Sequence, residues 1–313
     1  MDTFRTWIPR GFDFLTPGEA RKFLELKTRI RAVFQEAGFA EVIPPAFDYE
    51  RTFKLTTRGQ EKSPLFEMRD QDGQNLAVRS DLTVQVIKAA ASGRLGTQFP
   101  ARLSYIQPVF QDRPWGSGHS REITQAGIEL LGLPMEEGFP ETLNLARTCM
   151  TSLGQDARIV YGDVRFLNRL FEAVPASYRH VLSEAFHYKD SARVRAACAE
   201  AGLDEDLSRI LINVPLTFGD GRALDKLFDI CRGRPELLEI LQEARGVENV
   251  MYDMSLVREL SYYTGPVFEA YVAGCTEPIL SGGVYDNLFQ EFAGESRGAC
   301  GFALNLSLLV QRV

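Results

Sequence analysis

The sequence predicts an α+β fold in which helices flank a mainly antiparallel sheet, together with a mainly helical insertion. Two observations predict this class. Before about residue 140 and again after Val250, short β-like runs are separated by turn signals. Between these regions, long amphipathic helical stretches surround a single β-like run. We expect one domain over residues 1–313, with the insertion at about 155–250.

The composition is that of an ordinary globular protein, and it argues against several classes of function. Of the 313 residues, 45% are hydrophobic and 25% are charged, which is enough for a sizeable core. The formal net charge of −7 argues against a general polyanion-binding surface, because nucleic-acid-binding domains carry clustered basic residues. The five cysteines include no CxxC pair and the three histidines no HxxH pair, so we expect reduced thiols, no metal site and no cofactor.

The N-terminal segment predicts a capped helix and then a short strand. Thr16 to Glu19 form a capping box with proline at the first helical position. Apolar residues then recur at helical spacing up to Gly38, where the helix is expected to end. The run "GFAEVIPPAFDYE" is β-like until Pro44 and Pro45, which do not fit the middle of a sheet.

Several strands and one helix are expected next. The strand candidates are "SPLFEMRD" at 63–70, "QNLAVRS" at 74–80, "ARLSYIQPVFQD" at 101–112 and "REITQAGIELLG" at 121–132. The turn at 70–73 predicts that the first two form an antiparallel hairpin. The run from Leu82 to Ser92 alternates less cleanly, so we expect a helix that begins after Asp81 and ends at Gly93.

The remaining elements comprise the insertion and a return to strands. Helical stretches are predicted at 141–153, 164–174 and 223–244, around the β-like run "ARIVYGD" at 157–163. Strand signals follow in "VMYDMSL" at 250–256, "YYTGPVFEAYVAG" at 262–274 and "PILSGGVYDNL" at 278–288. Residues 301–311 contain no charge, and their length predicts a helix packed in the core.

The sequence lacks the signals of export or membrane insertion. Its start, "MDTFRTWIPRGFDF", has no basic segment followed by an apolar run. No stretch reaches about 18 uncharged apolar residues, the length that a membrane-spanning helix needs. We therefore expect a cytoplasmic protein without a membrane partner.

Polar residues on the strand at 121–132 suggest a ligand site. Alternation places Gln125, Gly127 and Glu129 on one face. Glycine in a strand often marks close approach of a ligand or another backbone, so this face can floor a binding site. The alternative is a solvated face, and alternation by itself leaves both open.

Two further stretches carry candidate ligand groups. In "AVRSDLT", Arg79 and Asp81 share a face and Thr83 lies where a helix begins. The alternative there is a helix cap, which can coexist with a ligand contact. In "LVRELSYYTGPVFEAYV", Arg258 lies near Tyr262 and Tyr263, and the alternative for the tyrosine pair is core packing.

Taken in order, these stretches resemble the catalytic domain of a class II aminoacyl-tRNA synthetase, specifically histidyl-tRNA synthetase. The resemblance covers essentially the whole chain and is weakest from about 155 to 250. The stretches that carry it are "PRGFDFLTPGEARK", "GFAEVIPPAFDYE", "RSDLT", "FQDRPWGSGHSREITQAGIE", "VRELSYYTGPVFE", "SGGVYDNL" and "GFALNLSLL". It implies the class II synthetase fold described above.

The resemblance also implies a retained amino-acid pocket. Asp81 matches the acidic residue for the α-amino group, and Thr83 and Gln125 match its polar partners. Glu129 and Tyr263 match the groups that hold the imidazole ring. Arg258 matches the arginine particular to the histidine enzymes, and its neighbour Tyr262 completes the expected histidine-binding set.

The nucleotide half of that site departs from the synthetase pattern. Gln111 stands at the arginine for the α-phosphate and Leu308 at the arginine for the γ-phosphate. Preorganised cations are the main resource for stabilising charge on a reacting phosphate, so we expect no catalytic residues here. Arg113 could replace Gln111 if the loop shifts, and this question stays open. Further departures occur at Glu259, Ser261 and Val284.

A synthetase-like chain with these departures resembles the regulatory subunits of ATP phosphoribosyltransferase. The chain stops at Val313, where a synthetase would continue into an anticodon-binding domain, so we expect neither that domain nor tRNA binding. The forms "RSDLT" and "REITQAGIELLG" fit this regulatory family better than the synthetase. The resemblance implies a short catalytic partner subunit, a homodimer within a hetero-octamer, and histidine as the feedback effector of the first step of histidine biosynthesis.

Two alternatives remain open at this point. One is a truncated histidyl-tRNA synthetase paralogue that still activates an amino acid. The other is a structural activator in which the histidine pocket is a relic.

Overall fold

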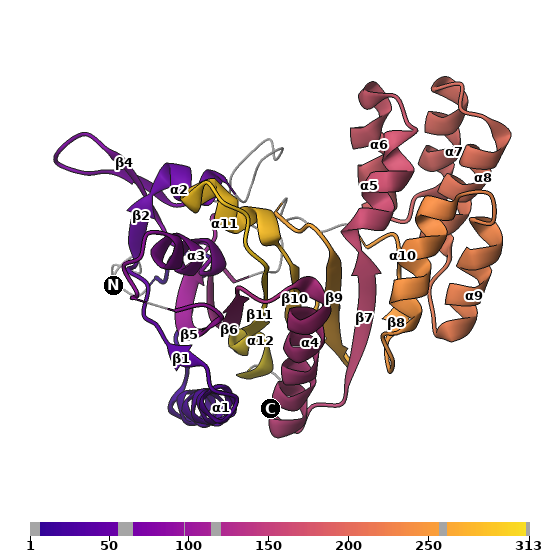
Figure 1. Cartoon of the computed structure of the whole chain (residues 1–313). Helices are drawn as coiled ribbons and strands as arrows, with labels where there is room; N and C mark the ends of the chain where they lie inside the picture. The colour runs from indigo at the N-terminus through magenta and orange to yellow at the C-terminus, as the bar shows by residue number, and fades with distance from the viewer. Residues whose placement is uncertain (1–6, 56–64, 97, 114–119, 257–261, 311–313) are drawn as a thin grey trace. The chain divides into compact units, whose positions relative to one another are not determined.

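The computed structural model describes residues 7–55, 65–96, 98–113, 120–256 and 262–310. The chain forms two compact units. Unit 1 comprises Met1–Asp156, Leu260–Tyr262 and Tyr285–Val313, and unit 2 comprises Ala157–Glu259 and Tyr263–Val284. Figure 1 traces both along the chain.

Unit 1 begins with the predicted capped helix, α1 (Pro17–Glu36). The Thr16 backbone N–H donates to Glu19 Oε2 at 2.8 Å, and the Glu19 N–H donates to Thr16 Oγ1 at 3.4 Å. The capping box is thus confirmed. One stripe of the helix is buried, with residues Leu26, Ile30, Val33 and Phe34. This spacing is that of a helix covering a core.

The strands of unit 1 form a mainly antiparallel arrangement, as the sequence predicts. Their order is β1 (Ala40–Glu41), β5 (Ala101–Phe110), β6 (Glu122–Leu131) and β11 (Ala299–Asn305). β5 pairs antiparallel with β6, β6 pairs antiparallel with β11, and only the short β1 runs parallel to its neighbour β5. β6 therefore has a partner strand on both sides, and its residues are held in a fixed register.

A smaller sheet and the remaining helices complete unit 1. The order of its strands is β2 (Phe47–Tyr49), β4 (Asn75–Val78) and β3 (Glu67–Arg69), and the β3–β4 pair confirms the predicted antiparallel hairpin. The helices are α2 (Glu50–Lys54), α3 (Thr83–Ala91), α4 (Met135–Ser152), α11 (Asp286–Ala293) and α12 (Leu306–Val310). α3, predicted from Leu82 to Ser92, packs against β6 and α11.

The predicted core helix over residues 301–311 is wrong for its first half. Residues up to Asn305 belong to β11, and only Leu306–Val310 form a helix. An uncharged run can be a buried strand or a buried helix, and periodicity does not separate the two. The core location itself is correct, because Phe302, Leu304 and Leu309 are buried.

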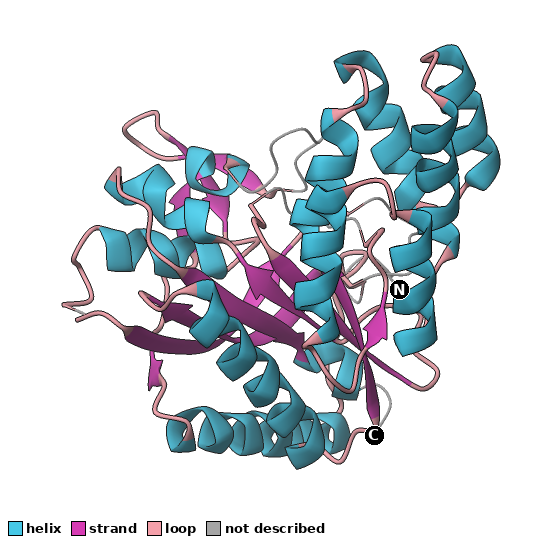
Figure 2. Cartoon of the chain, turned by 45° about the vertical axis from the view of Figure 1, so that its right-hand side comes forward, coloured by secondary structure: helices cyan, strands magenta, loops and turns pink. Residues whose placement is uncertain are grey.

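Unit 2 combines four strands with a group of helices. The strand order is β10 (Leu280–Val284), β9 (Pro266–Val272), β7 (Ala157–Asp163) and β8 (Met251–Tyr252), with β8 parallel to β7. The helices are α5 (Val164–Glu172), α6 (Ala176–His187), α7 (Ser191–Glu200), α8 (Glu205–Asn213), α9 (Gly221–Ile230) and α10 (Pro235–Arg245), with a 3₁₀ turn at Val214–Leu216. Figure 2 shows these helices side by side, and they make up most of residues 164–245.

The single stretch predicted at 223–244 is two helices. α9 ends at Ile230, and α10 begins at Pro235. Proline fits the first turn of a helix, where its missing N–H costs nothing, but it does not fit a helix interior. Pro235 therefore starts a new helix.

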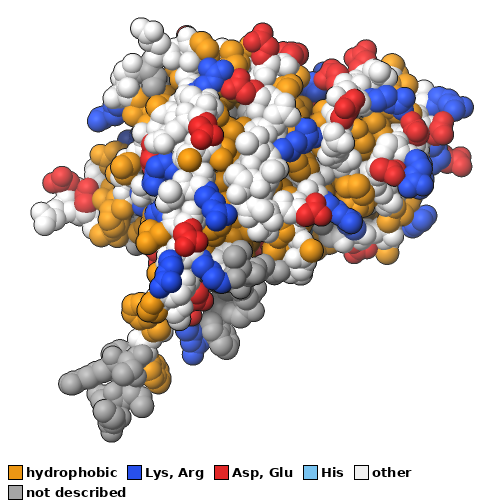
Figure 3. Space-filling model, turned by 90° about the horizontal axis from the view of Figure 1, so that it is seen from below, with side chains coloured by type: hydrophobic (Ala, Val, Ile, Leu, Met, Phe, Trp, Pro, Cys, Tyr) orange, Lys and Arg blue, Asp and Glu red, His pale blue; other side chains and the backbone are white. Residues whose placement is uncertain are grey.

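The surface and the helix lengths agree with the bulk composition. Within the described ranges, no helix combines the length and the apolar character that crossing a bilayer demands. On the face drawn in Figure 3, basic and acidic side chains of the described residues are interspersed. This face therefore carries side chains of both signs.

Candidate ligand-binding site

Asp81 and Thr83, two candidate ligand residues, lie in unit 1 at the start of α3. Thr83 is the first residue of α3, and its backbone N–H donates to Asp81 Oδ1 at 2.9 Å. One carboxylate oxygen therefore caps the helix. The other, Oδ2, is buried and has no hydrogen-bond partner among the described residues. The helix-cap and ligand interpretations of Asp81 are thus compatible.

Glu129 is the most buried carboxyl group in this part of the chain. It lies on β6 with 1% of its surface exposed, and its Oε2 accepts a hydrogen bond from the Tyr285 hydroxyl. Its Oε1 has no hydrogen-bond partner within the described residues. Across the ladder, Glu129 lies opposite Gly301 of β11. A Cβ at Gly301 would lie 2.6 Å from Glu129 Oε2, so only glycine leaves room for this carboxylate.

The space over Gly127 does not hold a ligand, contrary to the expectation from the sequence. Tyr105 of β5 lies directly opposite Gly127 in the register. Its hydroxyl occupies the position that a Cβ on Gly127 would need. The same hydroxyl lies 3.4 Å from Thr83 Oγ1. Gly127 therefore admits the end of a tyrosine, which links β6 to the start of α3.

Burial dominates the electrostatics of the two carboxyl groups. It raises the pKa of Glu129 to about 8, while the Tyr285 hydrogen bond and the nearby Thr83 hydroxyl act to lower it. Burial also raises the pKa of Asp81 to about 6, against hydrogen bonds from Thr83 that lower it. Within the described ranges, neither group forms an ion pair. The protein thus keeps two acids in a setting that disfavours their charged forms.

The geometry presents acceptors that lack donors. Asp81 Oδ2, Gln125 Oε1 and Glu129 Oε1 are all buried and all lack a hydrogen-bond partner in the described part of the chain. Burying an unpaired acceptor costs about 1–3 kcal/mol, and buried polar groups in native proteins are nearly always paired. A ligand that supplies N–H donors and positive charge would satisfy all three. Among the described residues, no three His, Cys, Asp or Glu side chains lie close enough together to hold a metal ion.

The other predicted ligand residues are placed differently. The Tyr262 ring packs edge-on against Tyr285, with 5.5 Å between the centroids, and so belongs beside Glu129 in unit 1. Tyr263 belongs to unit 2, where it is buried and lies close to Gly283. Arg258 lies outside the described residues, as do Glu259 and Ser261.

The expected phosphate positions lack the synthetase cations. Gln111 Oε1 accepts a hydrogen bond from Arg113 Nε at 2.8 Å, so the Arg113 guanidinium lies against the substituted position. Leu308 lies in α12, and its backbone N–H donates to Asn305 Oδ1 at 3.2 Å. Position 308 therefore offers no cation.

Sequence reasoning missed two residues that complete the cluster, Tyr105 and Tyr285. Both are fully buried, and burial raises the pKa of each hydroxyl well above its ordinary value. Both therefore stay protonated and can donate. Their signal was weak, because a tyrosine in a strand reads as packing until the register places it opposite a particular glycine or carboxylate.

Known proteins resemble the chain over nearly its whole length. The chain matches the family model described as histidyl-tRNA synthetase over residues 11–309. It is 35% identical to an ATP phosphoribosyltransferase regulatory subunit of Symbiobacterium thermophilum, covering 98% of this chain and 79% of that one. It is 30% identical to the protein of the same name in Leptospira interrogans, covering 97% and 93%.

Solved structures share the fold. An ATP phosphoribosyltransferase regulatory subunit/histidyl-tRNA synthetase from Bacillus halodurans superposes with a TM-score of 0.83 at 24% identity, covering 97% of this chain and 82% of that one. A histidine–tRNA ligase subunit from Alicyclobacillus acidocaldarius gives 0.77 at 24% identity, covering 97% and 96%. These likenesses confirm the class II synthetase-like fold.

The curated relatives are regulatory subunits, which confirms the expectation of a regulatory chain in place of a catalytic one. The chain belongs to the family of ATP phosphoribosyltransferase regulatory subunits, built on a histidyl-tRNA synthetase-like domain.

Proposed function

We propose that this chain is the non-catalytic regulatory subunit of an ATP phosphoribosyltransferase and senses L-histidine through the polar cluster of unit 1. In this role it is required for the first step of histidine biosynthesis and for feedback inhibition by the end product. One observation carries the proposal: Asp81 Oδ2, Gln125 Oε1 and Glu129 Oε1 are buried and lack donors among the described residues, while the positions that would hold ATP phosphates carry Gln111 and Leu308.

Histidine carries donors that suit the unpaired oxygens of Asp81, Gln125 and Glu129. Its α-ammonium group would donate to Asp81 Oδ2 and Gln125 Oε1. A ring N–H would donate to Glu129 Oε1. Tyr285 already occupies Glu129 Oε2, so the carboxylate offers one oxygen to the ring. Tyr262, Tyr263 and Arg258 remain proposed members of the site.

The proposed partners are a short catalytic subunit and a second copy of this chain. Large apolar side chains are exposed around the short strands of unit 1, which supports a homodimer through this face, within a hetero-octamer. They are Ile43 (75% exposed), Phe47 (46%), Tyr49 (40%) and Met68 (48%). We place the assembly in the cytoplasm and propose no tRNA partner.

Calorimetry on the complex with its catalytic subunit tests the proposal. Wild-type complex should bind histidine, and Glu129→Gln should weaken binding about 10- to 100-fold. The positive charge and the N–H donor of the bound ligand would favour the ionised form of Glu129, and a hydrogen bond to a charged group is worth about 1.5–3 kcal/mol. Glu129→Gln should also relieve feedback inhibition. The matched control is Glu122→Gln, an exposed carboxylate on the same strand, which should bind like wild type. Absence of histidine binding by the wild-type complex would refute the sensor.

One observation keeps the alternative of a truncated synthetase paralogue. Arg113 lies against Gln111 and could supply a phosphate contact in its place. This alternative requires histidine-dependent exchange of pyrophosphate into ATP by the isolated chain, and exchange lost in Arg113→Met. If no pyrophosphate exchange is found at millimolar substrate concentrations, the synthetase alternative is excluded and the regulatory role is the one that remains.

A further inference from the structure

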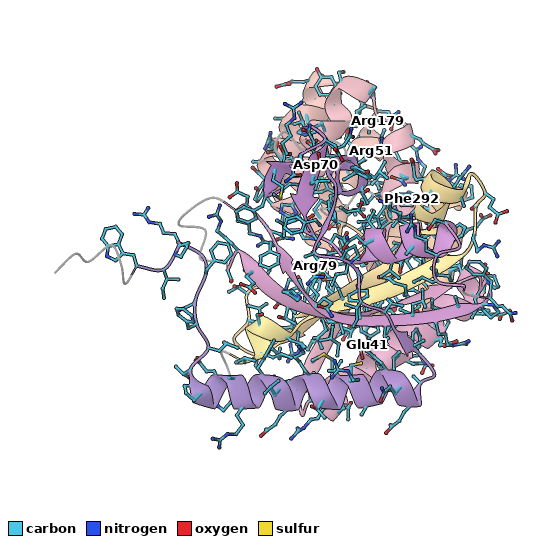
Figure 4. All side chains as sticks on the ribbon, turned by 90° about the vertical axis from the view of Figure 1, so that its left-hand side faces the viewer. Glu41, Arg51, Asp70, Arg79, Arg179 and Phe292 are labelled. Atoms are coloured by element: carbon cyan, nitrogen blue, oxygen red, sulfur yellow. The ribbon has the colours of Figure 1, made fainter. Side chains whose placement is uncertain are left out.

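Arg79 is a buried arginine with an unusual set of partners. It follows β4 directly and is 6% exposed. Its Nε donates to the carbonyl oxygen of Pro108 at 2.5 Å, its Nη1 to that of Pro44 at 2.8 Å, and its Nη2 to Gln107 Oε1 at 3.3 Å. Figure 4 labels Arg79, which lies inside unit 1 between the labelled Asp70 of the hairpin and Glu41 of β1.

The backbone of Arg79 joins the same segments as its side chain. Its N–H donates to the Ala46 carbonyl at 2.9 Å, and its carbonyl accepts from the Phe110 N–H at 2.9 Å. Three segments therefore meet at one residue: the stretch before β2, the end of β5, and the turn between β4 and α3. That turn carries Asp81 two residues later and Thr83 four residues later.

The charge of Arg79 does not account for its location. Among the described residues, Arg79 forms no ion pair, and burial lowers its pKa. A buried charge without a counter-ion costs several kcal/mol, which hydrogen bonds to carbonyl groups offset only in part. The planar guanidinium presents five donors in a fixed fork, and a lysine ammonium cannot hold three separated acceptors in one geometry. The presence of an arginine at this buried position is therefore best explained by the three chain segments that its hydrogen bonds hold together.

Both sides of the candidate site touch this arrangement. Gln107, held by Nη2, lies opposite Gln125 of β6 in the register. On the other side, the turn fixed by Arg79 leads directly to the Asp81 cap on α3.

We propose that Arg79 is a positioning residue that fixes Asp81 and Thr83 relative to β5 and β6, and so sets the affinity of the site for its ligand. The inference rests on the proposed function for the identity of that ligand, histidine. It gives Arg79 no contact with the ligand.

The test is a double-mutant cycle in the full complex with the catalytic subunit, with histidine binding measured by calorimetry. Arg79→Lys should weaken binding about 10- to 100-fold, the loss typical when a partner behind a ligand residue is removed. In an Asp81→Asn background the same change should alter affinity less than about 2-fold, because the residue that Arg79 positions no longer contributes. Equal losses in both backgrounds would overturn the inference.

Two further variants guard against a trivial explanation. Arg102→Met is the matched control, because Arg102 on the same β5 forms two hydrogen bonds to Glu141 of α4 and none to the turn before α3. It should leave histidine affinity unchanged. If Arg79→Lys does not fold, as judged by thermal unfolding, Gln107→Leu removes one arm of the arrangement and should weaken binding about 3-fold. Unchanged affinity in a folded Gln107→Leu would count against the inference.

A titration separates failure of this inference from failure of the proposed function. If the wild-type complex binds no histidine, the sensor proposal fails, and the carboxyl group of Asp81 is followed by carbon NMR. In wild type and Arg102→Met it should titrate near pH 6. In Arg79→Lys its pKa should fall toward the ordinary value, because a loosened turn admits water. An unshifted Asp81 in Arg79→Lys would refute the positioning role.

Discussion

Buried carboxylates are treated differently in the two units. In unit 2, the Asp163 side chain has no exposed surface, and Arg165 donates to both of its oxygens. Asp253 is likewise buried, and Lys189 donates to both of its oxygens at 2.8 and 2.7 Å. In unit 1, Glu129 and Asp81 each keep one buried oxygen that lacks a partner in the described part of the chain.

The difference separates carboxylates whose oxygens are all paired within the protein from carboxylates that keep an unpaired oxygen, which we propose for ligand binding. Asp163 accepts from the Arg165 backbone N–H at the start of α5, and Asp253 also accepts from the Ser255 N–H. Their lone pairs are used by the protein itself. Each unpaired oxygen of Asp81 and Glu129 destabilises the chain by about 1–3 kcal/mol. Such a loss is expected at a binding site, where a ligand supplies the missing donor, and not at a purely structural group.

The largest expected effect comes from removing a paired carboxylate. Asp163→Ala leaves Arg165 without its main partner and should lower the free energy of unfolding by about 3–5 kcal/mol in urea denaturation. Asp220→Ala is the matched control: Asp220 also caps a helix and also pairs with the arginine two residues later, but both side chains are exposed. It should lower the free energy of unfolding far less than Asp163→Ala, because water screens an exposed ion pair. Similar losses for the two variants would break the comparison.

The second-largest expected effect is the dependence of stability on pH that Glu129 causes. Its pKa rises from 4.5 to about 8 on folding, so at intermediate pH the folded protein holds a proton that the unfolded chain releases. Stability should therefore fall as the pH rises from about 4.5 to about 8, by at most about 1.4 kcal/mol per pH unit.

Glu129→Gln should remove that slope while keeping the acceptor for Tyr285. Thermal unfolding between pH 6 and pH 8 measures it, in a range above the pKa of about 6 for Asp81. The stability of the control variant Glu122→Gln should fall with rising pH in parallel with that of the wild type. A Glu129→Gln curve parallel to wild type would show that the carboxyl group is charged throughout.

The smallest expected effect is steric. Gly301→Ala would press a methyl group against the Ile128 carbonyl and against the hydrogen-bonded side of the Glu129 carboxylate. We expect a loss of about 1–3 kcal/mol in chemical denaturation, the usual range for overpacking. Gly18→Ala in α1, where a Cβ meets nothing within 4 Å, should be neutral or slightly stabilising. If Gly301→Ala leaves the free energy of unfolding unchanged, the Glu129 carboxylate does not pack closely against β11.

Much of the fold followed from local patterns. The capping box at Thr16, the hairpin turn at residues 70–73 and the helix after Asp81 each depend on a few neighbouring residues, so they could be predicted. The strand β11 could not, because an uncharged buried run looks the same as a helix until its partner strand is known.

The candidate site shows the same limit. Asp81, Thr83, Gln125 and Glu129 were found from their sequence context and lie in one unit. The roles of Tyr105 and Tyr285 depend on register and on contacts across 22 and 156 residues. Local reasoning also assigned the space over Gly127 to a ligand, and only the pairing with β5 shows a tyrosine there.

The contact between Gln111 and Arg113 makes these two positions depend on each other. Gln111 Oε1 is the acceptor of the Arg113 guanidinium. Arginine at position 111 would remove that acceptor and set two cations side by side. The same arginine would cost less after a neutral residue had replaced Arg113, so the order of the two substitutions decides what each one costs.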